Sequence, residues 1–409
     1  MLAFSIVAVF ALLLIVLGLI SKVRNDRKKF DQVAPVVAAK PFPQTVAYPT
    51  GVHYPQVAQE LAVQAVREAY ADWLAKLLLP DQEPGQAFIR MGVEKNLLRY
   101  QVSTTSFAQA LGMLFTLVMA GDDLFAHHRF ENLLAFALAH PSANQPDLTS
   151  WQSLPDVKPA RRQDADPHAE SWLALSLLAS AHQWRDPDRF KPLVILRHRL
   201  PALFQTYQKG REQEPQPYLI NAPAFFSFFS QVDQQNNWSI LSSSLAGQSA
   251  ELLTRDDLSL TGSGSAEESQ LALQLLSYGL DALQAGLASQ KNLSGKLLQI
   301  ARDCVLGFDQ SAHAPLTMER QGEFSYLAQL ACCAPVAMVY GDQALVDTLW
   351  QKLSVAEISK FDPMGISMRL LALMLLSGVM WPLSDTWQAA FLSRHVERSD
   401  CLRPLAGNI

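Results

Sequence analysis

The sequence predicts an all-α fold: a two-layer α/α toroid of antiparallel helix pairs, preceded by one transmembrane helix. Three observations lead to this prediction. About a dozen segments place apolar residues at three- and four-residue steps, no stretch alternates polar and apolar residues for long, and several segments are apolar on more than one face. A helix that is apolar all round is buried on several sides, as the inner helices of a two-layer ring are.

The composition suits a large helical core and argues against nucleic acid as a partner. The chain has 409 residues, of which 49% are hydrophobic, and its formal net charge is -5. A protein of this charge has no basic excess with which to bind phosphates. The four cysteines fit no zinc-ligand spacing, and the neighbouring His127 and His128 lack a ligand pattern such as HExxH. We therefore expect neither a metal nor a cofactor.

Residues 1–21 are predicted to be a single uncleaved anchor in a bacterial inner membrane. They contain no charged side chain and include the apolar run LAFSIVAVFALLLIVLGLI. At about 1.5 Å per residue, this run nearly matches a hydrocarbon core of about 30 Å. A cleaved signal peptide would have a basic start, a shorter apolar stretch and a small-residue cleavage site, and the segment has none of these.

Residues 22–56 are predicted to be a basic juxtamembrane segment followed by a Pro-rich linker. Five Lys and Arg residues lie between positions 22 and 29, whereas only the amino terminus precedes the anchor. The positive-inside rule therefore slightly favours the cytoplasm for the rest of the chain. Five prolines between positions 35 and 55 interrupt any helix, so we prefer a semi-extended linker without a function of its own.

The helical toroid is predicted to occupy residues 57–395, with a C-terminal tail at 396–409. Apolar periodicity predicts helices over residues 57–79, 106–125, 169–184, 192–207, 224–232, 238–254, 268–289, 296–308, 324–341, 344–353 and 366–380. Pro, Asp, Asn and Gly between these segments act as breakers. An α-solenoid would need similar helices, but a fixed repeat of roughly 30–45 residues is missing. The last helix is too short to cross a membrane comfortably, which favours a core helix.

Three segments occur in an order and spacing that resemble glycoside hydrolase family 8. They are residues 102–125, 168–184 and 218–241, and weaker echoes follow in ESQLALQLLSYGL and QGEFSYLAQL. The resemblance spans residues 70–381 and is closest to the periplasmic endoglucanase of bacterial cellulose-synthesis operons. It implies an (α/α)6-barrel. It also implies a periplasmic location, which conflicts with the charge that flanks the predicted anchor.

The resemblance further implies that the catalytic groups are missing. An inverting glycosidase uses one carboxylic acid to protonate the leaving oxygen and a second carboxylate to activate water. The family's acid, the Glu of a Ser-Glu-Gly-Gln stretch, corresponds to Phe107, which has no proton to donate. The Asp that grips the sugar corresponds to His168. The general base corresponds to Gln270, and an amide has no basic lone pair near neutral pH.

Several other residues are candidates for a groove along the barrel. The resemblance implies as groove residues Gln109, His168, Glu170, Trp172 and Gln270. An alternative register with a four-residue insertion would use Asp164 and Asp166, but the ungapped register keeps more matches and is preferred. Glu267 and Glu268 offer a substitute base, but capping of a helix start, favoured by the helix dipole, is the preferred explanation. Five aromatic residues could stack on sugar faces, although such rings more often pack in the core. They are Trp151, Trp172, Trp238, Phe225 and Phe226.

Three functions follow as hypotheses. In the first, the chain is a membrane-anchored, catalytically inactive family 8-like protein, a scaffold or glycan-binding component of exopolysaccharide biosynthesis or secretion, cellulose-type above all. Its barrel would bind a glucan strand or a protein partner. In the second, it is an active endo-β-1,4-glucanase that uses other carboxylates, namely Asp164, Asp166, Glu170, Glu267 or Glu268. In the third, it is a structural subunit of another bacterial envelope complex, since fold does not imply function. The loss of all three catalytic groups favours the first.

Overall fold

The computed structural model divides the chain into two units, residues 1–37 and residues 38–409. It describes residues 36–383 apart from 47, 49–50, 97–98, 154–162, 185–189, 213–222, 253–257, 262–264, 286–290, 309–323, 357 and 360. The predicted anchor at 1–21, the basic segment at 22–35 and the predicted tail at 396–409 lie outside the described residues. Within the described part, none of the helices has the length and apolar character that a bilayer crossing needs.

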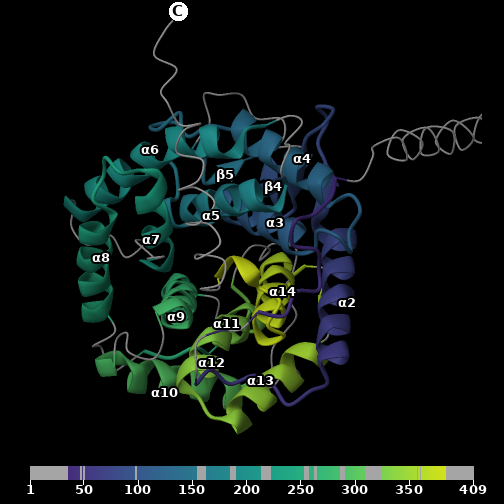
Figure 1. Cartoon of the computed structure of the whole chain (residues 1–409), viewed down its shortest axis with the longest axis vertical. Coiled ribbons are helices and arrows are strands. Elements are labelled where there is room, and N and C mark those ends of the chain that lie inside the picture. The colour runs from purple at the N-terminus through teal and green to yellow at the C-terminus, as the bar shows by residue number, and fades with distance from the viewer. Residues whose placement is uncertain are drawn as a thin grey trace, which may run out of the picture. The chain divides into compact units, whose positions relative to one another are not determined.

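Six helical segments of the described chain form an inner ring in the second unit (Figure 1). These are α3 (Ser106–Val118), α5 (Pro167–Gln183), α7 (Pro223–Val232), α9 (Ala266–Ala285), the nearly continuous pair α11 (Tyr326–Cys332) and α12 (Ala334–Tyr340), and α14 (Pro363–Leu376). Around the ring, α3 packs against α5, α7 against α9, α9 against the α11–α12 pair, α11 against α14, and α14 against α3. The rings of Trp172 and Phe225, whose centroids are 5.0 Å apart, join α5 to α7. The inner ring is therefore closed.

A second layer of helices covers this inner ring. Its members in the described chain are α2 (Gln59–Leu77), α4 (Ala126–Ala139), α6 (Pro192–Glu212), α8 (Trp238–Leu252), α10 (Lys291–Gly307) and α13 (Gln343–Val355). Each packs against inner helices, for example α2 on α14, α4 on α3 and α6 on α5. The predicted all-α, two-layer toroid is thus confirmed as an (α/α)6-barrel. Helix α14 is buried almost throughout, as expected for a core helix.

The N-terminal turns of the inner helices lie at one end of the barrel, which we call the N-terminal rim. The ring of Phe107, at the start of α3, lies 5.2 Å from that of His168, at the start of α5. Gln329 of α11 donates a 2.8 Å hydrogen bond to Glu268, in the first turn of α9. Because contacts at both places join first turns to first turns, these inner helices point the same way. The rim is where the predicted catalytic positions gather.

Short strands, which the sequence did not predict, lead into α3. Strand β1 (Leu78–Pro80) pairs with β2 (Ala87–Ile89), so α2 ends at Leu77 instead of continuing to residue 79. Strand β3 (Gly92–Asn96) pairs with β4 (Arg99–Thr105), and β4 pairs with the short β5 (Gln152–Ser153). Strand β4 runs directly into α3, where the Thr105 side chain accepts a hydrogen bond from the Ala108 N–H at 3.2 Å.

Residues 38–56 differ from the free linker that the sequence predicted, and we call them the strap. Phe42 N donates to the carbonyl of Ala120, just beyond α3, and Val46 N donates to the carbonyl of Gly378, just beyond α14, each at 2.8 Å. The side chains of Phe42 and Val46 are buried. The strap therefore packs across the C-terminal ends of inner helices, opposite the rim. The compact unit begins at residue 38, and not at the predicted boundary of 57.

Candidate functional site

The position that the sequence resemblance aligns with the family's catalytic acid is filled by a packed aromatic ring. Phe107 is the second residue of α3, and its side chain is 6% exposed. Its ring centroid lies 5.2 Å from that of His168 and 6.1 Å from that of Trp172. We call Phe107, His168, Trp172 and Phe225 the aromatic cluster. A benzyl group has neither a proton to donate nor a lone pair to accept one, so this position contributes packing only.

His168, which the resemblance aligns with the family's sugar-gripping Asp, is buried in the same cluster. The indole Nε1–H of Trp172 donates to His168 Nε2 at 3.2 Å, so this ring nitrogen serves as an acceptor within the protein. The His168 backbone N–H donates to Asp166 Oδ1 at 2.9 Å, which caps α5. The structure thus brings His168 and Trp172 together as predicted groove residues, but it places both side chains beneath the surface.

Gln109 is a positioning residue in this structure instead of an exposed groove side chain. Its Oε1 accepts a hydrogen bond from Ile89 N at 2.8 Å. Its Nε2 faces the carbonyls of Ala87 at 3.3 Å and Leu133 at 3.4 Å. The buried amide therefore ties strand β2 and helix α4 to α3, and these backbone groups occupy the polar atoms that a glycan would need.

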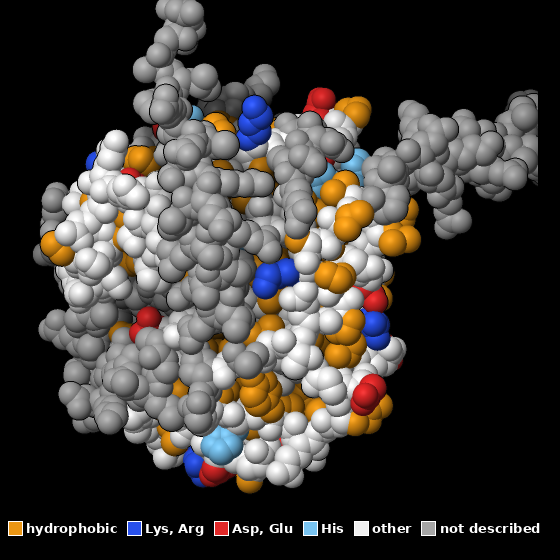
Figure 2. All heavy atoms as spheres, viewed as in Figure 1, with side chains coloured by type: hydrophobic (Ala, Val, Ile, Leu, Met, Phe, Trp, Pro, Cys, Tyr) orange, Lys and Arg blue, Asp and Glu red, His pale blue; other side chains and the backbone are white. Residues whose placement is uncertain are grey.

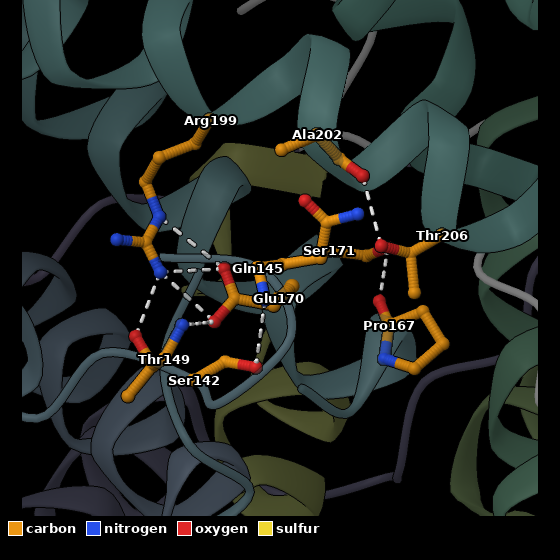
Figure 3. A network of polar contacts seen from close by, with 9 residues as sticks. All are labelled: Ser142, Gln145, Thr149, Pro167, Glu170, Ser171, Arg199, Ala202 and Thr206. Carbon is orange, nitrogen blue, oxygen red and sulfur yellow. Dashed lines mark hydrogen bonds and ion pairs between the residues drawn. The ribbon is translucent and has the colours of Figure 1, made fainter. Parts of the chain in front are cut away.

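Glu170 is likewise held inside the protein. Its side chain is 1% exposed and forms a bidentate ion pair with Arg199 of α6, with N···O distances of 2.7 and 2.9 Å from Nη2 (Figure 3). Glu170 Oε1 also accepts the backbone N–H of Thr149 at 2.7 Å. Both carboxylate oxygens are therefore occupied by hydrogen bonds within the protein and are not available to a substrate.

Gln270 and the two glutamates beside it lie in the first turns of α9. Gln270 is half-buried, and Glu267 is exposed. Glu268 accepts hydrogen bonds from Thr261 N at 3.1 Å and from Gln329 at 2.8 Å, and its own N–H donates to Ser265 Oγ. These contacts agree with a capping role for Glu268. Its side chain lies at a helix start and accepts hydrogen bonds from the backbone N–H of Thr261 and from Gln329 of the neighbouring helix α11.

Two carboxyl groups at the rim have perturbed acidities. Burial raises the pKa of Asp166 to about 6, against the opposing effect of the Ala169 and His168 N–H donors. Burial likewise raises the pKa of Asp362 to about 6, opposed by hydrogen bonds from Ser325 and from Gly365 N–H. Each precedes a proline at the first position of an inner helix. Asp362 was not singled out from the sequence, although an Asp-Pro before an apolar run is a recognisable helix start.

Trp151 is the one candidate stacking ring of the sequence that is half-exposed. Its relative exposure is 42%, whereas Trp172, Trp238, Phe225 and Phe226 are fully buried. The Trp151 carbonyl accepts a 2.9 Å hydrogen bond from Ser106 N, at the start of α3, and its N–H donates to the Asp164 carbonyl at 2.9 Å. Trp151 therefore lies at the rim, beside the start of α3 that carries the aromatic cluster.

The charges around this site do not suggest another ligand class. Among the described residues, no group of three His, Cys, Asp or Glu side chains is placed to hold a metal ion. On the face seen in Figure 2, the described Lys and Arg side chains lie apart from one another and form no basic patch. The groups described above at the rim offer aromatic stacking, hydrogen bonding and two carboxyl groups of raised pKa.

Comparisons with known proteins give relatives that share part of the chain. No family model matches the chain. An endoglucanase from Bacillus sp. (strain KSM-330) is 34% identical over 148 residues, which are 36% of this chain and 32% of that protein. A beta-glucanase from Niallia circulans is 31% identical over 170 residues, which are 41% of this chain and 39% of that protein. The matched segments thus span only 32% and 39% of the length of these two relatives.

Solved structures match over a much larger part. The beta-1,3-1,4-glucanase from Paenibacillus sp. X4 has a TM-score of 0.66 and 19% identity, and the match covers 84% of this chain and 99% of that one. A cold-adapted family 8 xylanase has a TM-score of 0.58 and 16% identity, with 85% and 97% of the two chains covered. These matches agree with the closed ring of helix pairs and with the collinear segments of the sequence. The chain therefore has a glycoside hydrolase family 8-like fold.

Proposed function

We propose that this chain is a catalytically inactive family 8-like protein that binds a β-glucan strand at the N-terminal rim. It would serve as a glycan-binding or scaffold component of a bacterial exopolysaccharide machine, of the cellulose type, and residues 1–21 would hold it in the inner membrane. One observation carries the proposal. Phe107, which the sequence resemblance aligns with the catalytic acid, is buried in the aromatic cluster.

Inactivity follows from what the rim can supply for proton transfer. Inverting hydrolysis needs two carboxyl groups about 6.5–9.5 Å apart, one to protonate the leaving oxygen and one to activate water. Phe107, His168 and Gln270 provide none at the expected positions. Of the carboxylates nearby, Glu170 is paired with Arg199, and Glu268 is bonded to neighbouring groups. The loss of general acid–base catalysis alone typically lowers a rate by about 10²- to 10⁴-fold for each group.

Glucan binding is supported by the exposed ring at the rim and by the relatives. An indole offers a large flat apolar face beside a polar edge, which suits the C–H face of a pyranose ring. Trp151 presents such a face, and both of its backbone polar groups are bonded to neighbouring segments. The names of the relatives, an endoglucanase and a beta-glucanase, make a β-glucan the first ligand to test.

The membrane side is a separate part of the proposal. A glucan-binding role requires the periplasm, whereas the basic residues after the anchor favour the cytoplasm. Alkaline phosphatase fused at the C-terminus would be active only in the periplasm, and a fluorescent protein fused there would support the cytoplasmic side. A cytoplasmic result would overturn the glucan-binding role and leave a scaffold that binds protein partners.

The main test uses the full chain purified in detergent or nanodiscs. It is incubated with carboxymethyl-cellulose and with mixed-linkage β-glucan, and new reducing ends are counted. Binding of cellohexaose is measured in parallel by calorimetry. We expect no turnover and measurable binding, which Trp151→Ala weakens about tenfold, equivalent to about 1.4 kcal/mol. Absence of binding, with a protein co-purifying instead, would support a structural subunit of another envelope complex.

A second candidate function is a hydrolase with displaced carboxyl groups, and one observation favours it. A general acid works best with a pKa near the working pH, and Asp166 and Asp362 both have pKa values raised to about 6. If turnover is found, Asp166→Asn and Asp362→Asn identify the group that carries it. Both variants keep an oxygen that can cap the helix, so the loss of activity would report the missing acid and not the missing cap.

A further inference from the structure

A buried ion pair joins two helices to the segment that carries Trp151, through contacts with Thr149. Glu170 belongs to the inner helix α5 and Arg199 to the outer helix α6, and both side chains are nearly inaccessible to solvent. We call residues 149–153 the platform segment. Thr149, at its start, contacts both members of the pair (Figure 3).

The contacts hold Thr149 by its backbone and by its side chain. Its N–H donates to Glu170 Oε1 at 2.7 Å, and its Oγ1 accepts from Arg199 Nη2 at 2.7 Å. The same Nη2 donates to Glu170 Oε2 at 2.7 Å. The three groups therefore form a closed triangle of charge-assisted hydrogen bonds, which are stronger and more directional than neutral ones. We call Glu170 and Arg199 the clamp.

Backbone hydrogen bonds also hold the rest of the platform segment in place. Trp151, two residues after Thr149, donates its N–H to the Asp164 carbonyl and accepts from Ser106 N. The next residue, Gln152, pairs with Thr105 in the β4–β5 ladder. The backbone on either side of the indole is thus held, by the clamp on one side and by β4 on the other, while the ring itself remains half-exposed.

Stability alone does not explain such a clamp. Taking two charges out of water costs free energy that their attraction often fails to recover, and well-packed apolar replacements are frequently as stable or more stable. A buried pair can instead give a neighbouring segment one defined arrangement. For a binding side chain this matters, because a ring that is already ordered loses less conformational freedom when its ligand binds.

We propose that Glu170 and Arg199 are positioning residues for Trp151, and that the clamp orders the platform segment so that the indole faces a sugar ring in one orientation. This inference rests on the proposed glucan binding, although its effect on the free protein is independent of it. Removal of the clamp then weakens cello-oligosaccharide binding through Trp151, while the barrel itself stays folded.

The test replaces the two charges together with Glu170→Met/Arg199→Met, so that neither charge is left buried alone. The protein is labelled with 5-fluorotryptophan, and the Trp151 signal in the 19F spectrum is assigned by its disappearance in Trp151→Phe. We expect cooperative unfolding to be retained, the Trp151 signal to broaden or shift, and the affinity for cellohexaose to fall about fivefold. Thr149→Val, which removes only the hydroxyl contact, should give a smaller change of the same kind.

A mutant cycle separates positioning from a general structural role. In a Trp151→Ala background, the clamp replacement should cost no further affinity, because the ring on which it acts is gone. An equal loss in both backgrounds, or an unchanged Trp151 signal with unchanged affinity, overturns the proposal. The control is the surface pair Asp72–Lys76, whose replacement by Asp72→Asn/Lys76→Gln should change none of these readouts.

The outcome also remains decisive if the proposed function fails. Should the wild-type chain bind no glucan, the Trp151 signal of the free protein still tests the clamp. A signal that broadens on loss of the clamp supports the positioning role, and a signal identical to that of the wild type refutes it. If the double variant does not unfold cooperatively, the signal and affinity of Thr149→Val decide in the same way.

Discussion

Replacement of Gln183 should release the strap from the barrel. This side chain is fully buried at the end of α5. Its Oε1 accepts from Lys40 N at 2.8 Å, and its Nε2 donates to the carbonyls of Lys40 at 2.8 Å and Leu117 at 2.9 Å. Each such bond contributes about 0.5–1.5 kcal/mol net. Gln183→Met, which keeps the volume but removes all three, should therefore lower the free energy of unfolding by about 2–4 kcal/mol.

Two assays measure this effect. Urea unfolding gives the change in the free energy of unfolding. Limited digestion with thermolysin reports how accessible the strap is, and we expect faster cleavage of the strap in Gln183→Met than in the wild type. The matched control is Gln64→Met, because Gln64 is exposed and donates a 2.9 Å hydrogen bond to Glu68 of the same helix. Its cost should stay below about 0.5 kcal/mol. If Gln183→Met unfolds and is cleaved like the wild type, Gln183 does not latch the strap and residues 38–56 behave as the free linker first expected.

Three further predictions concern single sites. Because burial raises the pKa of Asp362 to about 6, the unfolded chain loses this proton first as pH rises from about 4. The protonated carboxyl therefore contributes up to about 3 kcal/mol to the free energy of unfolding below about pH 4, and this contribution is lost by about pH 6. Urea titrations at pH 4 and pH 7 should show that Asp362→Asn removes this part of the pH dependence. Gly121→Ala should cost about 1–3 kcal/mol in the same assay, since φ is +100° and the added Cβ would lie 2.6 Å from Pro41 Cβ, whereas Gly295→Ala, with open space around it, should not destabilise. Phe107→Glu should give no turnover of carboxymethyl-cellulose, because Gln270 still cannot act as a base, and turnover by this variant would contradict the assignment of Gln270.

The sequence was sufficient to predict the inner helices because their signal is local. Apolar residues at helical spacing predicted helices at 169–184 and 366–380, and the structure has α5 at Pro167–Gln183 and α14 at Pro363–Leu376. The helix predicted over 106–125 ends at Val118, because the chain turns at Gly121 with a positive φ. Glycine at a left-handed position is a local signal for such an end, and it was available in the sequence.

Two kinds of element were missed for different physical reasons. Helix α4 (Ala126–Ala139) has Phe130, Leu133, Leu134 and Ala137 buried at helical spacing. The apolar pattern of this helix was therefore present in the sequence, although no helix was predicted there. The strands are different, because a three-residue strand such as β1 exists only through pairing with β2. Pairing partners that lie across a loop are not visible in a local pattern.

The strap and the site depend on contacts between distant residues. The prolines of residues 35–55 correctly suggested an extended chain, but nothing local shows that it docks on the carbonyls of Ala120 and Gly378. In the same way, Phe107 was identified from the motif, whereas its packing on His168 depends on two helix starts that lie side by side. Glu170 was expected along a groove, and its partner Arg199 is 29 positions away in the chain.

The most direct test of the central claim is a long incubation of excess protein with cellohexaose in H2-18O, followed by mass spectrometry. Excess protein and long times reveal even a residual rate, and hydrolysis would leave 18O at each new reducing end. With Phe107 in place of the acid, we expect intact cellohexaose and no labelled fragment. Labelled shorter oligosaccharides that Asp166→Asn or Asp362→Asn abolishes would contradict it and identify the chain as a working glucanase.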